Sequence, residues 1–129
     1  MKTAEDGPRT AVIFLHIPKT AGTTLHNILD RQYPPQSIHS FGADAHASVD
    51  QFKALDAAER GQIRLLRGHM AYGLHEYLPD GAKYFTLLRE PIARVISTYN
   101  FIHRTPDHYL YEHVVGQKMS LRDLMESEL

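Results

Sequence analysis

An almost unbroken apolar run near the amino terminus constrains the fold of this 129-residue chain more than any other feature. Residues 11–17 read Ala-Val-Ile-Phe-Leu-His-Ile, and Pro18 follows directly. A short run rich in β-branched residues, without polar alternation, is typical of a strand buried on both faces, as in a parallel sheet covered by helices. The run therefore predicts a central strand at 11–17.

Two later segments, 62–67 and 83–88, also have the character of strands, and helical patterns separate the three. We expect Thr23 or Thr24 to cap a helix after the first strand. The alternation of strands and helices predicts an α/β fold. More exactly, we expect a P-loop-like three-layer sandwich with a central parallel sheet flanked by helices.

The connecting segments give weaker signals. Residues 34–47 are polar and mixed, so we expect a loop there. Ser48 and Gln51 have the spacing of a capping box, which predicts a helix that starts at Ser48 and runs to near Gly61. Residues 74–78 suggest a short helix before the turn at Pro79.

The carboxyl-terminal part reads as two helices. Pro91 suits the first position of a helix whose apolar stripe continues to Ile102, before Pro106. Ser120 and Asp123 form another capping-box pattern. The last helix has an apolar face that needs a partner. We therefore expect that the domain continues beyond the end of the chain, or that this face packs on another chain, including a second copy. The apolar residues of that face are Leu121, Leu124, Met125 and Leu129.

Composition excludes several classes of protein. With 43% apolar and 22% charged residues and a net charge of −1, the chain suits a soluble globular protein without a positive field for nucleic acid. No cysteine is present, so no disulfide or thiolate site exists. The polar start and the lack of a long apolar run predict a cytoplasmic location and no membrane partner. We expect a flexible leader at 1–10 and a single, incomplete domain at 11–129.

Residues 16–24, His-Ile-Pro-Lys-Thr-Ala-Gly-Thr-Thr, lie where a buried strand passes into a helix. At such a place the helix N-terminus offers N–H groups and a positive dipole end to an anion. Gly22 allows close approach of the backbone, and Lys19 adds a positive charge. The order of residues is not that of a Walker A loop, in which lysine follows the glycines. The pattern therefore predicts a site for phosphate-like groups.

Residues 87–99 repeat this context, with a strand, a loop and a helix. Arg89 is expected at the strand end, where open α/β sheets bind ligands, and a guanidinium can hold a phosphate with two hydrogen bonds. Ser97 shares a helix face with Arg94 and Phe101, off the apolar stripe. Two anion sites at neighbouring strand ends would suit a nucleoside with phosphates at both ends.

Together these motifs resemble the sulfotransferase superfamily, which uses 3′-phosphoadenosine 5′-phosphosulfate (PAPS) as donor. HIPKTAGTT resembles its 5′-phosphosulfate loop, and R-E-P-x-x-R-x-x-S-x-Y its 3′-phosphate motif. The likeness covers roughly residues 11–103 and is greatest to the carbohydrate group that includes heparan sulfate 2-O-sulfotransferases and their bacterial relatives. Catalytic domains of the family are usually longer, so the resemblance implies that this chain is a truncated, amino-terminal portion.

The resemblance also implies roles for individual residues. Lys19 would contact the transferring sulfuryl group, and Arg89 and Ser97 would hold the 3′-phosphate. His69, which follows Gly68, would be the general base, although the chain has nine histidines. The 5′-phosphate would be held by the backbone of Thr20, Ala21, Gly22, Thr23 and Thr24, together with the hydroxyls of the last two.

Other polar residues are given lesser roles. His75 and Glu76 are alternative bases, and His16 and His26 are taken as structural. His103, His108 and His113 are spaced by five and interrupted by Pro106, so no metal site is expected.

The implied reaction moves a sulfuryl group from PAPS to an acceptor hydroxyl, leaving adenosine 3′,5′-bisphosphate; the acceptor is expected to be a carbohydrate. Two other functions stay open. A small-molecule kinase should show a Walker A loop and a carboxylate for Mg²⁺, and neither appears. A non-catalytic nucleotide-binding module would bind the same ligand without turnover.

Overall fold

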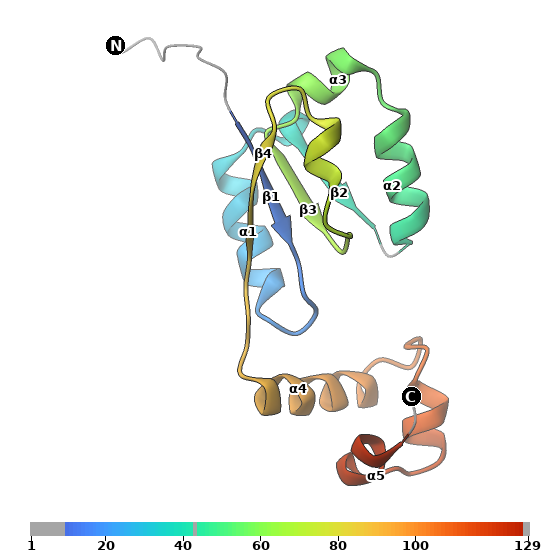
Figure 1. Cartoon of the computed structure of the whole chain (residues 1–129). Coiled ribbons are helices and arrows are strands. Elements are labelled where there is room, and N and C mark those ends of the chain that lie inside the picture. The colour runs from blue at the N-terminus through green and yellow to red at the C-terminus, as the bar shows by residue number, and fades with distance from the viewer. Residues whose placement is uncertain (1–9, 43, 128–129) are drawn as a thin grey trace. The chain divides into compact units, whose positions relative to one another are not determined.

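The computed structural model describes residues 10–42 and 44–127. These residues fall into two compact units that divide after Leu88, and each is described by itself (Figure 1). The leader expected at 1–10 lies outside the described residues except for Thr10. The single domain expected at 11–129 stays a prediction.

The first unit contains a four-stranded parallel sheet with the strand order β2-β3-β1-β4. In the register of this sheet, Ile13 of β1 lies opposite both Leu66 of β3 and Tyr84 of β4. The carboxyl ends of all strands therefore meet at one edge. The strands are β1 (Ala11–Leu15), β2 (Ile38–Phe41), β3 (Leu65–Gly68) and β4 (Ala82–Thr86).

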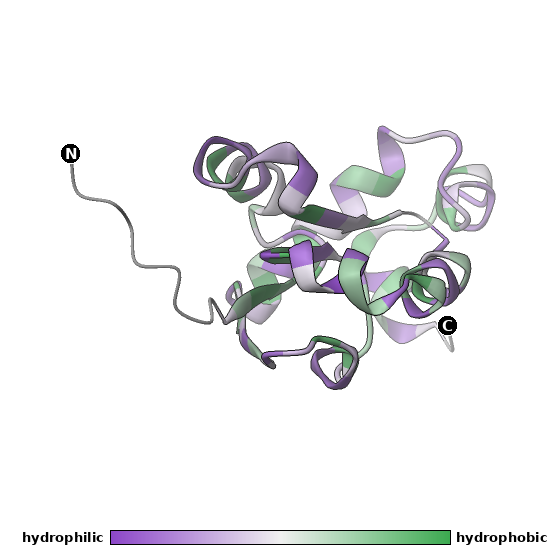
Figure 2. Ribbon diagram, turned by 90° about the horizontal axis from the view of Figure 1, so that it is seen from above, coloured by the Kyte–Doolittle hydropathy of each residue, from purple (hydrophilic) through white to green (hydrophobic). Residues whose placement is uncertain are grey.

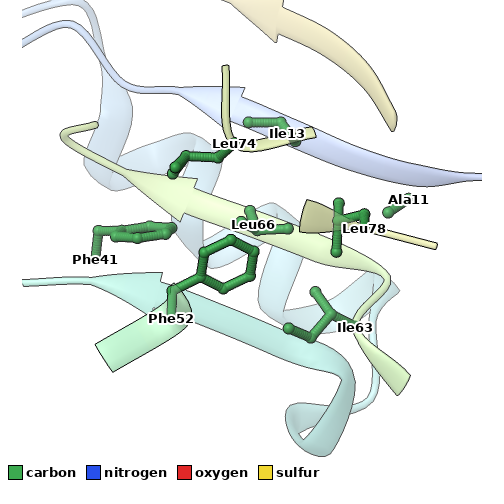
Figure 3. Close-up of a cluster of buried hydrophobic side chains, with 8 residues drawn as sticks. All are labelled: Ala11, Ile13, Phe41, Phe52, Ile63, Leu66, Leu74 and Leu78. Carbon is green, nitrogen blue, oxygen red and sulfur yellow. The ribbon is translucent and has the colours of Figure 1, made fainter. Parts of the chain in front are cut away.

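Helices cover both faces of this sheet, which confirms the predicted α/β fold with a central parallel sheet (Figure 1). On one face, Phe14 and Leu65 pack with Leu29 of α1. On the other face, Phe52 of α2 and Leu74 join a larger cluster, which Figure 3 shows. The helical elements are α1 (Gly22–Gln32), η1 (Pro35–Ser37), α2 (Ala45–Ala54), α3 (Ala57–Gln62) and η2 (Leu74–Tyr77).

The pattern of hydropathy explains why both faces are covered. Along β1, Ile13 and Phe14 point to opposite faces, and both are fully buried. The helices carry green and purple patches on their ribbons in Figure 2, as amphipathic helices do when one side packs inward. A strand that is apolar at successive positions is stable only between two layers, as the apolar run at 11–17 indicated.

The second unit is helical, with α4 (Pro91–His103), the π-helical turn η3 (Glu112–Gly116) and α5 (Leu121–Glu126). Pro91 is the first residue of α4, as predicted. The predicted capping box of α5 is also confirmed, because Ser120 and Asp123 bond each other's backbone N–H groups. Ile102 and Val114 are fully buried in this unit. No helix in the described part of either unit is long and apolar enough to cross a membrane.

Several predicted elements were wrong in part. The loop expected at 34–47 contains the strand β2, which pairs with β3. The helix expected to begin at Ser48 begins at Ala45, because the side chain of Asp44 accepts the hydrogen bond from the Ala47 N–H. The Ser48 hydroxyl instead donates to the Asp44 carbonyl oxygen.

The helix expected to continue to Gly61 is divided into α2 and α3. Asp56 and Glu59 form a capping box that starts the second of them. The strands expected at 11–17, 62–67 and 83–88 end or begin within three residues of the observed bounds. The short helix expected at 74–78 is the 3₁₀ turn η2.

Candidate functional site

The segment between β1 and α1 lies at the carboxyl edge of the sheet. It is tied there by backbone hydrogen bonds, since the His16 N–H donates to the Gly68 carbonyl oxygen over 3.0 Å. The Thr86 hydroxyl donates to the Leu15 carbonyl oxygen over 2.6 Å. The segment is therefore bonded to the end of β3, and the residue before it to the end of β4, at the edge where an open α/β sheet places its ligand.

The loop has an unusual backbone. Lys19 and Ala21 have φ angles of 68° and 67°, in the left-handed region that residues other than glycine rarely adopt. Thr20 between them is not in that region, so the sign of φ alternates along the loop. Alternating conformations of this kind turn successive N–H groups toward one concave side, which forms an anion-binding nest. Strain of this sort is typical of ligand-binding loops.

A buried side chain holds this backbone in place. Thr20 is 4% exposed, and its hydroxyl donates to the Ile17 carbonyl oxygen over 2.7 Å. The hydroxyl therefore closes the loop internally, and the backbone N–H of Thr20 is the group left for a ligand role. By contrast, Thr23 and Thr24 are exposed in the first turn of α1.

The N-terminus of α1 differs from those of the other described α-helices. Its N-cap is Ala21, which provides no side-chain hydrogen bond, and no acidic residue lies in its first turn. The expectation that Thr23 or Thr24 caps this helix was wrong, because the left-handed backbone at Ala21 starts the helix earlier, at Gly22. The helix dipole and the first N–H groups are thus not offset by a cap. The four other described α-helices are each capped by a side chain, those of Asp44, Asp56, Glu90 and Ser120.

Gly22 is required by a close approach to His16. A Cβ atom at Gly22 would lie 1.8 Å from Nε2 of His16, far inside contact distance. The start of α1 therefore packs directly on the imidazole ring. Sequence reasoning selected Gly22 for its nearness to a ligand, but the structure shows that its neighbour within the protein also demands glycine.

His69 lies at the same edge, directly after β3. Gly68 has a φ of 131°, and a Cβ there would lie 2.6 Å from the Phe41 carbonyl oxygen, so only glycine fits. The exposed His69 ring has its Nδ1 atom 2.8 Å from the His16 carbonyl oxygen. A carbonyl oxygen only accepts, so Nδ1 carries the proton in this contact. The neutral ring then keeps an unprotonated Nε2, which is the form that a general base needs.

Three histidine rings gather around the start of the loop. The His16 ring stacks on that of His69 with centroids 4.6 Å apart, and meets that of His26 edge-on at 5.2 Å. Burial and the neighbouring His69 and His26 lower the pKa of His16. Burial, and then the Arg67 guanidinium, lower the pKa of His26. Both of these rings are therefore held in the neutral form more strongly than a free histidine.

Arg67 ties this region together. Its guanidinium forms a 2.7 Å ion pair with Asp30 of α1 and bonds the Ser40 hydroxyl of β2 over 3.0 Å. It also donates to the His26 carbonyl oxygen. No sequence motif singled out Arg67, because its partners are far from it along the chain.

The second predicted phosphate motif lies in the second unit. Arg89 precedes α4 by two residues and is exposed, and Ser97 is half-buried in the second turn of this helix. The N-terminus of α4 is occupied by the Glu90 carboxylate, which accepts from the N–H groups of Ile92 and Ala93. Any anion recognition by this motif would therefore use side chains rather than the first N–H groups of α4.

The alternative bases, His75 and Glu76, lie in η2. The backbone N–H and the ring of His75 contact the Tyr84 hydroxyl at 3.2 and 3.1 Å, on the side of the sheet where η2 packs. Glu76 is exposed in η2. Among the residues that the structure describes, no group of three or more histidine and carboxylate side chains is arranged to hold a metal ion.

Comparison with known proteins identifies the family of this chain. A protein-tyrosine sulfotransferase of Arabidopsis thaliana is 32% identical over 91 residues, which cover 70% of this chain but 17% of the plant protein. No solved structure matches the chain. The model of the sulfotransferase family matches residues 7–127, which is nearly the whole sequence. On this match, the protein belongs to the sulfotransferase family.

Proposed function

We propose that the chain binds PAPS at the loop between β1 and α1 and takes part in sulfuryl transfer to an acceptor hydroxyl. The observation that carries this proposal is the uncapped start of α1 behind the strained loop. Four other described α-helices have side-chain caps, whereas the helix that follows Lys19 has none. Its first N–H groups and dipole suit a phosphosulfate.

The residues of the loop suit the donor's charge. The N–H groups from Thr20 onward would hold the 5′-phosphate, and the hydroxyls of Thr23 and Thr24 would add two donors. Lys19 would lie against the sulfuryl group and the bridging oxygen, where negative charge grows as the sulfur–oxygen bond breaks. Arg89 and Ser97 would bind the 3′-phosphate by side-chain hydrogen bonds.

The proposed step is a proton transfer coupled to the exchange of one sulfur–oxygen bond for another, and it needs no metal ion. Nε2 of His69 takes the proton of the acceptor hydroxyl, whose oxygen forms a bond to sulfur. The bond between sulfur and the bridging oxygen breaks, and its electron pair leaves with adenosine 3′,5′-bisphosphate. The tautomer set by the His16 carbonyl supports His69 in this role, since it leaves Nε2 available.

The acceptor is proposed as a carbohydrate hydroxyl, from the likeness of the motifs to the carbohydrate sulfotransferases. The similarity to a protein-tyrosine sulfotransferase favours a second candidate, the phenolic hydroxyl of tyrosine. Both acceptors need the same donor site and the same base. Sulfated product from an oligosaccharide, compared with that from a tyrosine peptide, separates them directly.

Calorimetric titration with adenosine 3′,5′-bisphosphate tests the donor site. We expect Lys19→Ala to weaken binding about 10- to 100-fold, because a charge-assisted hydrogen bond is worth about 1.5–3 kcal/mol. Lys83→Ala, which removes an exposed lysine of β4, is the matched control and should leave the affinity unchanged. Arg89→Ala should weaken binding as well. Equal affinities for wild type and Lys19→Ala would contradict the proposal.

Two further measurements separate the other functions. Preference for ATP with Mg²⁺ over adenosine 3′,5′-bisphosphate would point to a small-molecule kinase. His69→Ala should keep nucleotide affinity and lose transfer if the protein is an enzyme. Binding by wild type without any sulfated product, for every acceptor class tried, would instead identify a non-catalytic nucleotide-binding module.

A further inference from the structure

A row of stacked aromatic rings leads from the buried core of the first unit to His69. Phe85 stacks on Phe14 with centroids 4.9 Å apart, and Phe14 stacks on His16 at 5.5 Å. His16 then stacks on the exposed His69 at 4.6 Å, with 22° between the rings. Phe14, between Phe85 and His16 in this row, is fully buried, so it anchors the row. The ring of His16 links this anchored end to His69.

The main chain of His16 also contacts His69 and the residue before it. Its N–H donates to the Gly68 carbonyl oxygen, and its own carbonyl oxygen accepts from Nδ1 of His69. One residue therefore fixes His69 twice, through a hydrogen bond in the plane of the ring and through a stacking contact on its face. Together these two contacts restrict the tilt and the rotation of the ring.

The ring of His16 also packs against Gly22 at the start of α1. It occupies the space in which a side chain at Gly22 would lie, since a Cβ there would approach Nε2 to 1.8 Å. Gly22 is the first residue of α1, whose N–H groups belong to the proposed donor site. A shift of Gly22 would therefore displace the His16 ring, on which His69 stacks.

We propose that His16 is a positioning residue that holds His69 in the Nδ1–H tautomer and sets its ring relative to the start of α1. This inference rests on the proposed role of His69 as base and deepens it. It also revises the interpretation of His16 as merely structural. An aliphatic side chain would fill the space but would offer no flat face on which an imidazole can stack.

The tautomer of His69 is measurable without any ligand, by ¹⁵N-detected NMR of the histidine rings at a pH where they are neutral. We expect Nδ1–H in the wild type, although free histidine favours the other tautomer. His16→Leu, which keeps bulk but removes the flat ring, should shift His69 to a mixture of tautomers. His16→Phe, which keeps a flat ring, should retain Nδ1–H. His46→Ala, at an exposed position of α2, is the matched control and should have no effect.

Gly22→Ala tests the same inference independently, because it alters no atom of His16 or His69. The added methyl group must displace the His16 ring, so we expect the tautomer of His69 to change as it does in His16→Leu. Amide spectra establish that each variant is folded. A wild-type ring in the Nε2–H form would overturn the inference. So would folded His16→Leu and Gly22→Ala variants that both leave the tautomer unchanged.

The same proteins are then titrated with adenosine 3′,5′-bisphosphate, so that the two proposals can be judged separately. If His69 behaves as expected but no variant or wild type binds the nucleotide, the positioning of His69 stands and the proposed function is contradicted. If nucleotide binds and Lys19→Ala weakens it, but the tautomer does not respond to His16, the donor site stands and the positioning role is contradicted.

Discussion

The hydroxyl of Thr20 donates a 2.7 Å hydrogen bond to the carbonyl oxygen of Ile17, and this bond closes the loop that precedes α1. The loop holds two residues other than glycine in the left-handed region, Lys19 and Ala21, each of which costs free energy relative to an ordinary backbone. A buried bond between neighbouring residues helps to keep that arrangement when no ligand is present. The candidate phosphate site is therefore preorganised by the chain itself.

Replacement of this buried hydroxyl should affect both stability and binding. In Thr20→Val the Ile17 carbonyl oxygen loses its donor, so we expect the free energy of unfolding to fall by about 1–2 kcal/mol. Affinity for adenosine 3′,5′-bisphosphate should fall as well, since the loop is less well held. Urea denaturation and calorimetry measure the two effects. Thr23→Val, at an exposed position, is the control for stability and should change it by less than about 0.5 kcal/mol. An equal loss of stability in the two variants would contradict this account.

The neutral histidines should make the protein less stable as the pH falls. His16, His26 and His39 have pKa values lowered from 6.5, chiefly by burial. Below pH 6.5 the unfolded chain therefore binds more protons than the folded one, and stability falls with pH until the folded-state pKa values are passed. Above pH 6.5 this contribution is fully present. Urea denaturation at several pH values from about 7.5 to 5 measures the slope.

A variant that removes one of these groups tests the cause. His39→Gln cannot gain a proton, so its stability should depend less steeply on pH than that of the wild type. The carboxylates with lowered pKa values, Glu90 and Asp123, start from 4.5 and 3.8 and titrate below this window. A slope identical to that of the wild type would show that His39 does not contribute.

The Glu90 carboxylate should control the first turn of α4. Its pKa is lowered by hydrogen bonds from the N–H groups of Ala93 and Ile92, with Arg89 adding a smaller effect. Glu90→Ala leaves these donors without a side-chain cap, so we expect faster amide hydrogen exchange in the first turn of α4. Exchange in α5, which Ser120 caps, is the internal control. Unchanged exchange at Ile92 and Ala93 would mean that the cap is unimportant.

The larger buried cluster should dominate the stability of the first unit. Phe52 is fully buried and packs between α2 and the sheet, as Figure 3 shows. Phe52→Ala should lower the free energy of unfolding by about 3–5 kcal/mol, through lost burial and the cavity left behind. Ile28→Ala, at a position that is 49% exposed, should cost far less. Chemical denaturation compares the two, and similar costs would contradict this assignment of the core.

Local signals identified the elements that depend on neighbouring residues. The apolar run at 11–17 indicated β1, Pro91 marked the start of α4, and Ser120 with Asp123 marked the start of α5. The same reasoning missed β2, because this short segment of mixed polarity becomes a strand only through pairing with β3. It also misplaced the start of α2. Both Asp44 and Ser48 are residue types that cap helices, and the local pattern does not decide which of them does so.

The parallel α/β fold and the candidate phosphate loop could be predicted from local patterns, since apolar strand patterns, glycine and charged residues act over a few neighbouring positions. How the residues of that edge meet depends instead on contacts made in the folded chain. Lys19 and Ala21 adopt left-handed backbones, His16 lies against Gly22, and the carbonyl of His16 selects the tautomer of His69. His16 and His69 are 53 residues apart in the chain, and the parallel pairing of β1 with β3 brings them together. Contacts of this range form only when strands that are far apart in the sequence pair in the folded chain.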